Sequence, residues 1–361
     1  MASMAQFLPY SSARRLVQLN EVDERYKKRA RRWLIFCALT EPLRWYERMR
    51  WGATLRRTEI KEAPLFLLGF GRSGTTHLHN LMWQDPQFGG VTNYQASLHS
   101  IALMGQSWLP KLFAGQMPKT RPMDNVAISL EGPQEEEMAM MNATHHAPLH
   151  VMSFPRGAPE IYDRYVADLG KDLEATGGWK KAYVEVLKKA TLLTGGKRLV
   201  LKTPPNTGRI DVLLDMFPDA RFVNIVRNPY PVYQSMRNMY RKTLPGAVLQ
   251  QIDWQQIDAW IVQAYQSQMQ KYLAQRSLIP DRHLVEIKYE ELEAHPLETL
   301  EDIYEKLNLG DFEVQRPRLV SYLESLGEYK KNHFEFPSDI VETVNRSWGF
   351  AFDAFGYKRQ V

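Results

Sequence analysis

A glycine-rich segment between two apolar stretches has the residue types of a phosphate-binding loop, Leu68-Gly69-Phe70-Gly71-Arg72-Ser73-Gly74-Thr75-Thr76. Glycines in such a turn allow successive backbone N–H groups and the N-terminus of the following helix to point at one anion. The spacing nearly matches the nucleotide-triphosphatase signature G-x-x-x-x-G-K-[ST], but Thr75 stands where that signature requires lysine. The segment therefore predicts a phosphate site in which Arg72 supplies the positive charge.

Two further basic residues follow apolar runs that we predict to be strands. Arg227 ends the run 222–226, where a Walker-type NTPase has a magnesium-binding aspartate, and Ser235 follows about two helical turns later. A guanidinium and a hydroxyl in this arrangement are suited to a second phosphate. Lys202 follows the run 198–201, and the prolines after it predict a loop at the sheet edge where α/β proteins bind ligands.

Short apolar runs alternate with helical patterns along most of the chain, which predicts an α/β fold. The predicted strands are 64–68, 198–201, 222–226 and 283–287. Helical patterns follow at 75–84, from Ile210, from Pro229 and from Pro296. Such alternation favours a P-loop-like, mostly parallel sheet flanked by helices on both faces. The stretch 92–156 fits this scheme poorly, and we expect it to cover the substrate side.

The composition is that of an ordinary globular protein, with 361 residues, 44% hydrophobic and 24% charged. The single cysteine, Cys37, excludes an intramolecular disulfide and favours a reducing compartment, so we expect a cytoplasmic protein. The apolar stretch 33–39 is too short to cross a bilayer, and the N-terminus lacks the pattern of a secretory signal. We expect two parts, a helical basic extension over 1–61 and an α/β domain over 62–361.

The positive charge is concentrated in the extension. Residues 1–61 contain fourteen Lys or Arg and six Asp or Glu, whereas the remaining 300 residues contain 32 basic and 35 acidic ones. A dense basic run at 25–32 leads into aromatic residues at 33–51, which is typical of a helix on an anionic membrane surface. The same pattern also occurs in helices packed on a neighbouring domain, and we favour that interpretation here. Because the body of the chain is not basic, nucleic-acid binding is not expected.

Taken together, the loop at 66–82 and the motif at 221–235 resemble the sulfotransferase superfamily, in particular its bacterial-type branch, which is also similar to tyrosylprotein sulfotransferases. The resemblance covers residues 60–361. Further matching blocks are Arg121-Pro122-Met123-Asp124-Asn125, Gly132-Pro133-Gln134-Glu135-Glu136-Glu137, Leu201-Lys202-Thr203-Pro204, Lys288-Tyr289-Glu290-Glu291-Leu292 and Phe355-Gly356-Tyr357. The resemblance implies transfer of the sulfuryl group of 3′-phosphoadenosine 5′-phosphosulfate (PAPS) to a hydroxyl or amine of a small acceptor.

The resemblance also implies roles for individual residues. The 5′-phosphosulfate is expected at Gly71, Arg72, Ser73, Gly74, Thr75 and Thr76, the 3′-phosphate at Arg227 and Ser235, and the adenosine beside Tyr289. Arg72 and Lys202 are expected to stabilise the leaving oxygen. Since in-line transfer of a group low in charge needs positioning and positive charge, no metal is expected.

The catalytic base is less clearly marked. Related branches have a glutamate soon after the first helix, but this chain reads Thr92-Asn93-Tyr94-Gln95 there. If Pro133 is the first helical residue, Glu137 lies on the apolar side of the helix and Glu135 and Glu136 turn away. We therefore expect Glu137 to be the base, with Glu135 second. The alternatives are that these acids only stabilise the helix dipole and that the base is a histidine.

Two other functions remain compatible with parts of the pattern. A P-loop kinase or NTPase would explain the loop, but this chain lacks the lysine and the metal-binding aspartate that such an enzyme requires. A non-catalytic nucleotide-binding relative would not require Arg72, Lys202 and Arg227 together. The histidines do not predict a zinc site, because His77 and His79 are two residues apart and point to different faces of a helix. The 3′-phosphate motif also has Asn228 where an aspartate is common.

Overall fold

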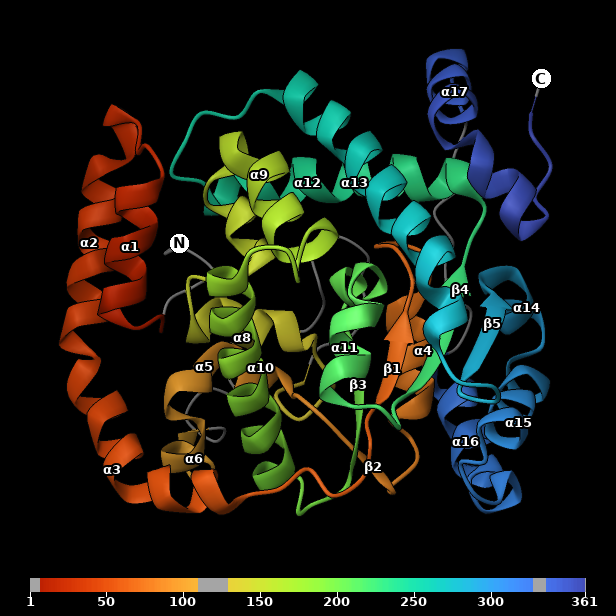
Figure 1. Cartoon of the computed structure of the whole chain (residues 1–361), viewed down its shortest axis with the longest axis horizontal. Helices are drawn as coiled ribbons and strands as arrows, with labels where there is room; N and C mark the ends of the chain where they lie inside the picture. Colours follow the sequence, from red (N-terminus) through yellow and green to blue (C-terminus); the bar gives the residue numbers. More distant parts are fainter. Residues whose placement is uncertain (1–6, 110–128, 327–335, 361) are drawn as a thin grey trace. The chain divides into compact units, whose positions relative to one another are not determined.

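The structure, a computed structural model, describes residues 7–109, 129–326 and 336–360 (Figure 1). Contacts divide the chain into two compact units. The first comprises Met1–Glu62, Gly89–Leu199 and Met239–Trp260, and the second comprises Ala63–Phe88, Val200–Asn238 and Ile261–Val361. Among the described residues, no helix is both long and apolar enough to span a membrane.

A five-stranded sheet has the order β2-β3-β1-β4-β5. Its strands are β1 (Leu65–Leu68), β2 (Phe88–Gly89), β3 (Arg198–Lys202), β4 (Arg221–Val226) and β5 (Leu284–Lys288). β1 pairs in parallel with β3 and with β4, and β4 pairs in parallel with β5. The predicted α/β fold with a mostly parallel sheet is confirmed, and so are all four predicted strands. The two-residue β2 was not predicted, because so short a strand leaves no periodic pattern.

The second unit has its core between the sheet and helices that follow the strands. These helices are α4 (Thr75–Met82), α11 (Ile210–Met216), α14 (Tyr289–Ala294), α15 (Pro296–Leu307), α16 (Arg316–Leu326) and α17 (Ser338–Phe355). Leu65 and Leu67 of β1 face a cluster that includes buried residues of α4 and α15, whereas the ring of Phe66 stacks on Phe222 at 5.5 Å. This alternation follows from the two-residue period of a strand, and β1 is covered on both faces at the centre of the sheet.

Two long helices begin in one unit and end in the other: α12 (Pro229–Ala247) and α13 (Trp254–Gln275). Proline is favoured at the first helical position because its missing N–H has no partner there. The predicted helix starts at Pro229 and Pro296 are confirmed. Single-turn segments connect the larger elements at Glu24–Tyr26, His99–Ile101, Pro148–Met152, Pro155–Gly157, Asp163–Ala167, Pro204–Gly208, Arg276–Leu278 and Phe312–Val314.

The described elements of the first unit are helices, apart from the ends of β2 and β3 that fall within it. Its helices are α1 (Tyr10–Leu19), α2 (Lys27–Leu39), α3 (Glu41–Arg57), α5 (Asn93–Leu98), α6 (Ala102–Gly105), α8 (Glu136–Ala143), α9 (Ala158–Tyr162) and α10 (Leu173–Leu193). Leu16 of α1 and Trp33 of α2 belong to one buried cluster. A buried ion pair joins α10 to α3, with Nζ of Lys189 2.7 Å from Oε1 of Glu47. Most of the basic residues between positions 25 and 57 lie in α2 and α3.

Candidate active site

The glycine-rich loop turns sharply between β1 and α4. Gly69 has φ 142° and Gly74 has φ 95°, in the region that favours glycine. A Cβ on Gly69 would lie 2.5 Å from the backbone oxygen of Ile225, and one on Gly74 would overlap the ring of Tyr289. The N–H of Gly69 donates to Oγ1 of Thr207 at 2.7 Å. The loop is thus closely packed against neighbouring elements and leaves no room for side chains at these two positions.

Arg72 connects the loop to the second predicted phosphate motif. Its φ is 70°, a left-handed conformation that is uncommon for a residue with a side chain and typical of anion-binding turns. Nε of Arg72 donates to Oγ of Ser235 at 2.9 Å. The carbonyl oxygen of Arg72 accepts a hydrogen bond from Nη1 of Arg227 at 3.3 Å. The structure therefore brings together the three residues that the sequence assigned to two separate phosphates.

Tyr289 forms one wall of the same region. Cζ of Arg227 lies 4.1 Å from the centre of the Tyr289 ring, within the range of a cation–π interaction. The hydroxyl of Tyr289 donates to Glu293 at 2.8 Å, which fixes the orientation of the ring. Gly74 lies against the same ring, because an added Cβ would overlap its atoms. Tyr289 therefore lies next to both phosphate motifs.

Lys202 ends β3 and approaches the first turn of α4. Its side chain is buried, with 2% of the residue exposed, and its Nζ lies 3.4 Å from Oγ1 of Thr76. Burial lowers the pKa of His79 well below its usual value, and the charge of Lys202 lowers it further. His79 is therefore neutral near pH 7, while the cationic Lys202 is directed at the helix that follows the loop.

Glu290 compensates for the missing aspartate of the second motif. The N–H of Asn228 donates to Oε1 of Glu290 at 3.1 Å, and the hydroxyl of Tyr357 donates to Oε2 at 2.8 Å. Oδ1 of Asn228 accepts from the N–H of Tyr230 at 3.2 Å and so caps α12. The motif therefore keeps a carboxylate at its backbone, contributed by α14 instead of by position 228.

Several supporting residues were missed by the sequence analysis. Phe70, within the loop, packs edge-on against Tyr265 at 5.0 Å, and Tyr265 stacks on Trp348 at 3.8 Å between ring centres. Thr207, the acceptor for Gly69, was also missed. Aromatic residues far along the chain carry no local signal that they contact the loop, whereas Thr207 follows the Pro204-Pro205 pair that marked this edge of the sheet.

The three candidate acids lie in the first unit, and their local structure differs from the prediction. The helix α8 begins at Glu136, with Glu135 at the N-cap, whereas Pro133 forms an isolated bridge with Thr92. The expectation that Pro133 is the first helical residue is therefore wrong. Glu136 and Glu137 are both fully buried and Glu135 is half-buried. The prediction that Glu136 turns away from the apolar side is wrong as well.

Glu136 and Tyr183 form a buried pair within this unit. The hydroxyl of Tyr183 donates to Oε1 of Glu136 at 2.9 Å. Burial raises the pKa of Glu136 to about 7, although the hydrogen bonds that it accepts act in the opposite direction. A carboxyl in this environment exchanges its proton near neutral pH, which is a property suited to proton transfer and also a cost to stability.

Two buried histidines that could be considered as the base, His145 and His150, are poor bases. Burial lowers the pKa values of His145 and His150 to about 4, so both imidazoles are neutral and weakly basic near pH 7. Across residues 7–109, 129–326 and 336–360, no group of three His, Cys, Asp or Glu side chains is arranged to hold a metal ion. The block Arg121–Asn125, which supported the resemblance, lies outside the described residues.

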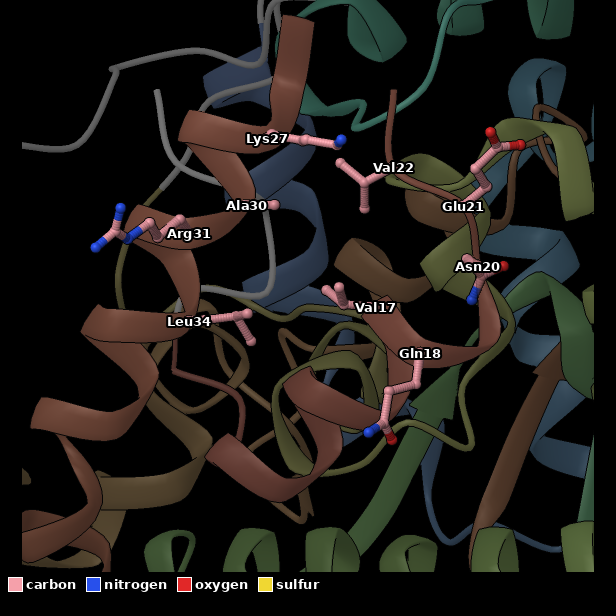
Figure 2. Close-up of a pocket in the computed structure, with 9 residues that line it drawn as sticks. All are labelled: Val17, Gln18, Asn20, Glu21, Val22, Lys27, Ala30, Arg31 and Leu34. Carbon is pink, nitrogen blue, oxygen red and sulfur yellow. The ribbon is translucent and has the colours of Figure 1, made fainter. Parts of the chain in front are cut away.

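A hollow of about 590 Å³ lies between α1 and α2 (Figure 2). Val17, Val22 and Leu34 point into it, whereas Arg31 is directed away from it. None of the residues predicted for phosphate binding or catalysis lines this hollow.

The comparisons with known proteins agree with the fold and the phosphate motifs. The sequence profile of the sulfotransferase family matches residues 64–313. The chain belongs to the sulfotransferase family, as the sequence motifs predicted. It is therefore an enzyme of sulfuryl transfer, and the match favours this activity over a P-loop kinase or NTPase.

One relative and two solved structures indicate how far the similarity extends. The chain is 31% identical over 319 residues to omega-hydroxy-beta-dihydromenaquinone-9 sulfotransferase Stf3 of Mycobacterium bovis, covering 87% of this chain and 80% of the relative. Sulfotransferase STF9 from Mycobacterium avium has a similar fold, with a TM-score of 0.68, 18% identity and coverage of 98% of this chain and 97% of that chain. For sulfotransferase STF1 from Mycobacterium tuberculosis the TM-score is 0.61, with 19% identity and coverage of 85% and 81%. These two structures support the fold alone.

Proposed function

We propose that the chain uses PAPS as its sulfuryl donor, bound by the second unit. The observation that carries the proposal is the contact among Arg72, Ser235 and Arg227, which joins two anion-binding motifs. A donor with phosphates at both its 5′ and 3′ positions requires two such motifs in proximity. Gly74 is the N-cap of α4 with φ 95°, and the N-terminus of a helix after such a turn suits the binding of a phosphate.

The proposed roles are those that the sequence motifs imply, and the contacts of Arg72, Arg227 and Ser235 support them. The loop residues Gly71, Arg72, Ser73, Gly74, Thr75 and Thr76 hold the 5′-phosphosulfate. Arg227 and Ser235 hold the 3′-phosphate, and Tyr289 contacts the adenosine. Arg72 and Lys202 stabilise the negative charge that develops on the phosphate oxygen when its bond to sulfur breaks. The acceptor oxygen bonds to sulfur as the bond between sulfur and the leaving phosphate oxygen breaks. The proton of the acceptor passes to a base in the same step.

The proposed acceptor is a hydroxyl group on a small molecule. The support is the mycobacterial relative, an omega-hydroxy-beta-dihydromenaquinone-9 sulfotransferase that is 31% identical to this chain. Identity at this level does not extend the particular acceptor to this enzyme. An amine acceptor would require the base to take a proton from a different group, and nothing among the described residues favours it.

We further propose that the base belongs to the acidic turn at the start of α8. A base must contact the acceptor, and of the two candidates Glu135 is half-buried whereas Glu137 has no exposed surface. The test is single-turnover transfer by Glu135→Gln and Glu137→Gln, with the exposed Glu131→Gln as the matched control. A loss of transfer with unchanged donor affinity assigns the base. Near wild-type rates in both variants would show that these acids only stabilise the helix.

Binding of adenosine 3′,5′-bisphosphate, the product of the donor, tests the proposed donor site. We expect calorimetry to detect binding in the presence of EDTA and Arg227→Ala to weaken it by about 2 kcal/mol, because a phosphate loses a charged partner. Arg318→Ala, which removes an exposed arginine of the same unit, is the control and should bind normally. Binding that requires a divalent metal and prefers ATP would contradict the proposal.

A further inference from the structure

An exposed apolar face extends over α2 and α3 in the first unit. Large side chains that would ordinarily be buried are 40% to 73% exposed there: Ile35, Phe36, Leu39, Leu43, Trp45, Tyr46 and Met49. We call these seven residues the α2–α3 face. The opposite sides of the same helices are packed, because Trp33 and Cys37 of α2 and Arg44 and Glu47 of α3 are buried. A concentration of exposed apolar residues of this size indicates a surface that is covered by something else.

Basic residues border this face on both sides along the chain. Exposed Lys or Arg precede it at 28, 31 and 32 and accompany or follow it at 48, 50, 56 and 57. Figure 2 shows Arg31 extending outward from α2, away from the hollow between α1 and α2. The face and its border therefore combine apolar, aromatic and cationic side chains.

Negative charge is nearly absent from the same two helices. The only carboxylates of α2 and α3 are Glu41 and Glu47. Glu47 is buried and paired with Lys189 at 2.7 Å. Glu41 is partly covered, lies 3.1 Å from Nη2 of Arg44 and accepts the N–H of Tyr10 at 2.6 Å. The basic border is therefore not neutralised by neighbouring acids of these helices.

We propose that the α2–α3 face docks on the surface of an anionic lipid bilayer. Helices with apolar side chains between basic ones lie in the interface of such bilayers, where tryptophan and tyrosine are favoured at the headgroup level. Juxtaposed lysines and arginines are attracted by the negative surface potential. A second copy of the chain is a poorer occupant, because a two-fold interface would bring the two basic borders together. The proposal does not depend on the identity of the sulfuryl donor or acceptor.

Vesicle flotation of the full chain tests this proposal. We expect binding to vesicles of phosphatidylcholine mixed with phosphatidylglycerol, little binding to phosphatidylcholine alone, and release at high salt because exposed charges are screened. Each basic residue near the surface strengthens binding to anionic membranes about fivefold. Arg31→Glu/Arg32→Glu is therefore expected to weaken vesicle binding ~20-fold or more. Leu39→Ser/Trp45→Ser is expected to weaken vesicle binding by a factor that does not depend on the salt concentration.

Matched controls separate this face from the general properties of the chain. Lys181→Glu/Arg318→Glu makes the same change of charge elsewhere, and Leu173→Ser/Val314→Ser removes exposed apolar side chains elsewhere. Both control variants are expected to bind vesicles as the wild type does. Brominated lipids should quench tryptophan fluorescence in the wild type and much less in Trp45→Phe, which reports contact by a conservative change.

Three results would overturn the proposal. The first is equal flotation of the face variants and the controls, with thermal unfolding showing that all are folded. The second is equal binding to neutral and anionic vesicles at low salt. The third is self-association in sedimentation that Leu39→Ser/Trp45→Ser abolishes while anionic vesicles bind nothing, since the face would then be a contact between copies of the chain.

Discussion

Replacing Gly74 with alanine is the most direct perturbation of the proposed donor site. Gly74 has φ 95°, and an added Cβ would overlap Cδ2 of Tyr289 and lie 2.9 Å from Cε2. Alanine therefore meets two separate penalties, one from the backbone conformation and one from the ring. The ring in turn lies against Arg227, so displacing it disturbs the proposed 3′-phosphate contact.

The size of the effect can be worked from these two penalties. A residue with a side chain in the left-handed region costs about 1 to 2 kcal/mol relative to glycine. Overlap with a packed ring adds about 1 to 3 kcal/mol, since the ring must move or the loop must shift. We therefore expect Gly74→Ala to lower the free energy of unfolding by about 2 to 5 kcal/mol, and to weaken binding of adenosine 3′,5′-bisphosphate.

Two comparisons separate the penalties experimentally. Gly310 has φ 106° with nothing within 4 Å of an added Cβ, so Gly310→Ala carries the backbone penalty alone and should leave ligand affinity unchanged. In a Tyr289→Ala background the overlap is absent, so Gly74→Ala should cost only about 1 to 2 kcal/mol there. Urea unfolding measures all of these variants. Equal costs of Gly74→Ala with and without the Tyr289 ring would refute the reasoning.

Three further predictions concern burial and charge. Because burial raises the pKa of Glu136 from 4.5 to about 7, this group makes the folded state less stable as pH rises through that window. Glu136→Gln should therefore flatten the pH dependence of unfolding by up to about 3 kcal/mol, and an unchanged profile would contradict the buried carboxyl. Lys189→Met should lower the free energy of unfolding by about 3 to 5 kcal/mol because it leaves the buried Glu47 without an opposite charge. Lys189→Met/Glu47→Leu should recover most of this loss in the same urea titration. Ser235→Ala should weaken adenosine 3′,5′-bisphosphate binding about tenfold in calorimetry, with the exposed Ser325→Ala unchanged.

The sequence predicted the sheet and the phosphate motifs because both depend on local patterns. Each of the four predicted strands is a buried apolar run with a clear boundary, and the loop from Gly69 to Thr76 has the local glycine spacing of a phosphate-binding turn. The contacts that exclude a Cβ at Gly69 and Gly74 come from Ile225 and Tyr289, which no local pattern indicates. A parallel sheet brings the carboxyl ends of its strands to one edge, and Lys202 ends β3 while Arg227 follows β4 there.

The parts that were wrong or missed depend on contacts between distant residues. The start of α8 shifted from Pro133 to Glu136 because Pro133 pairs with Thr92, forty-one positions earlier in the chain. The helical periodicity of the sequence around the acids does not indicate such a bridge. Burial of Glu136 likewise depends on Tyr183 of α10, which the pattern around the acids does not contain.

The substitution at Asn228 shows why a motif should be read together with its surroundings. From the sequence, the change from aspartate removes a negative charge beside Arg227. In the structure, Glu290 accepts the N–H of Asn228, and Tyr357 donates to the same carboxylate. Asn228 in turn caps α12 through its own Oδ1, a role that asparagine and aspartate perform about equally well. A carboxylate from α14 therefore binds the backbone of this turn while position 228 remains neutral, so the loss of the acid from the motif does not imply the loss of an ordered turn at Arg227.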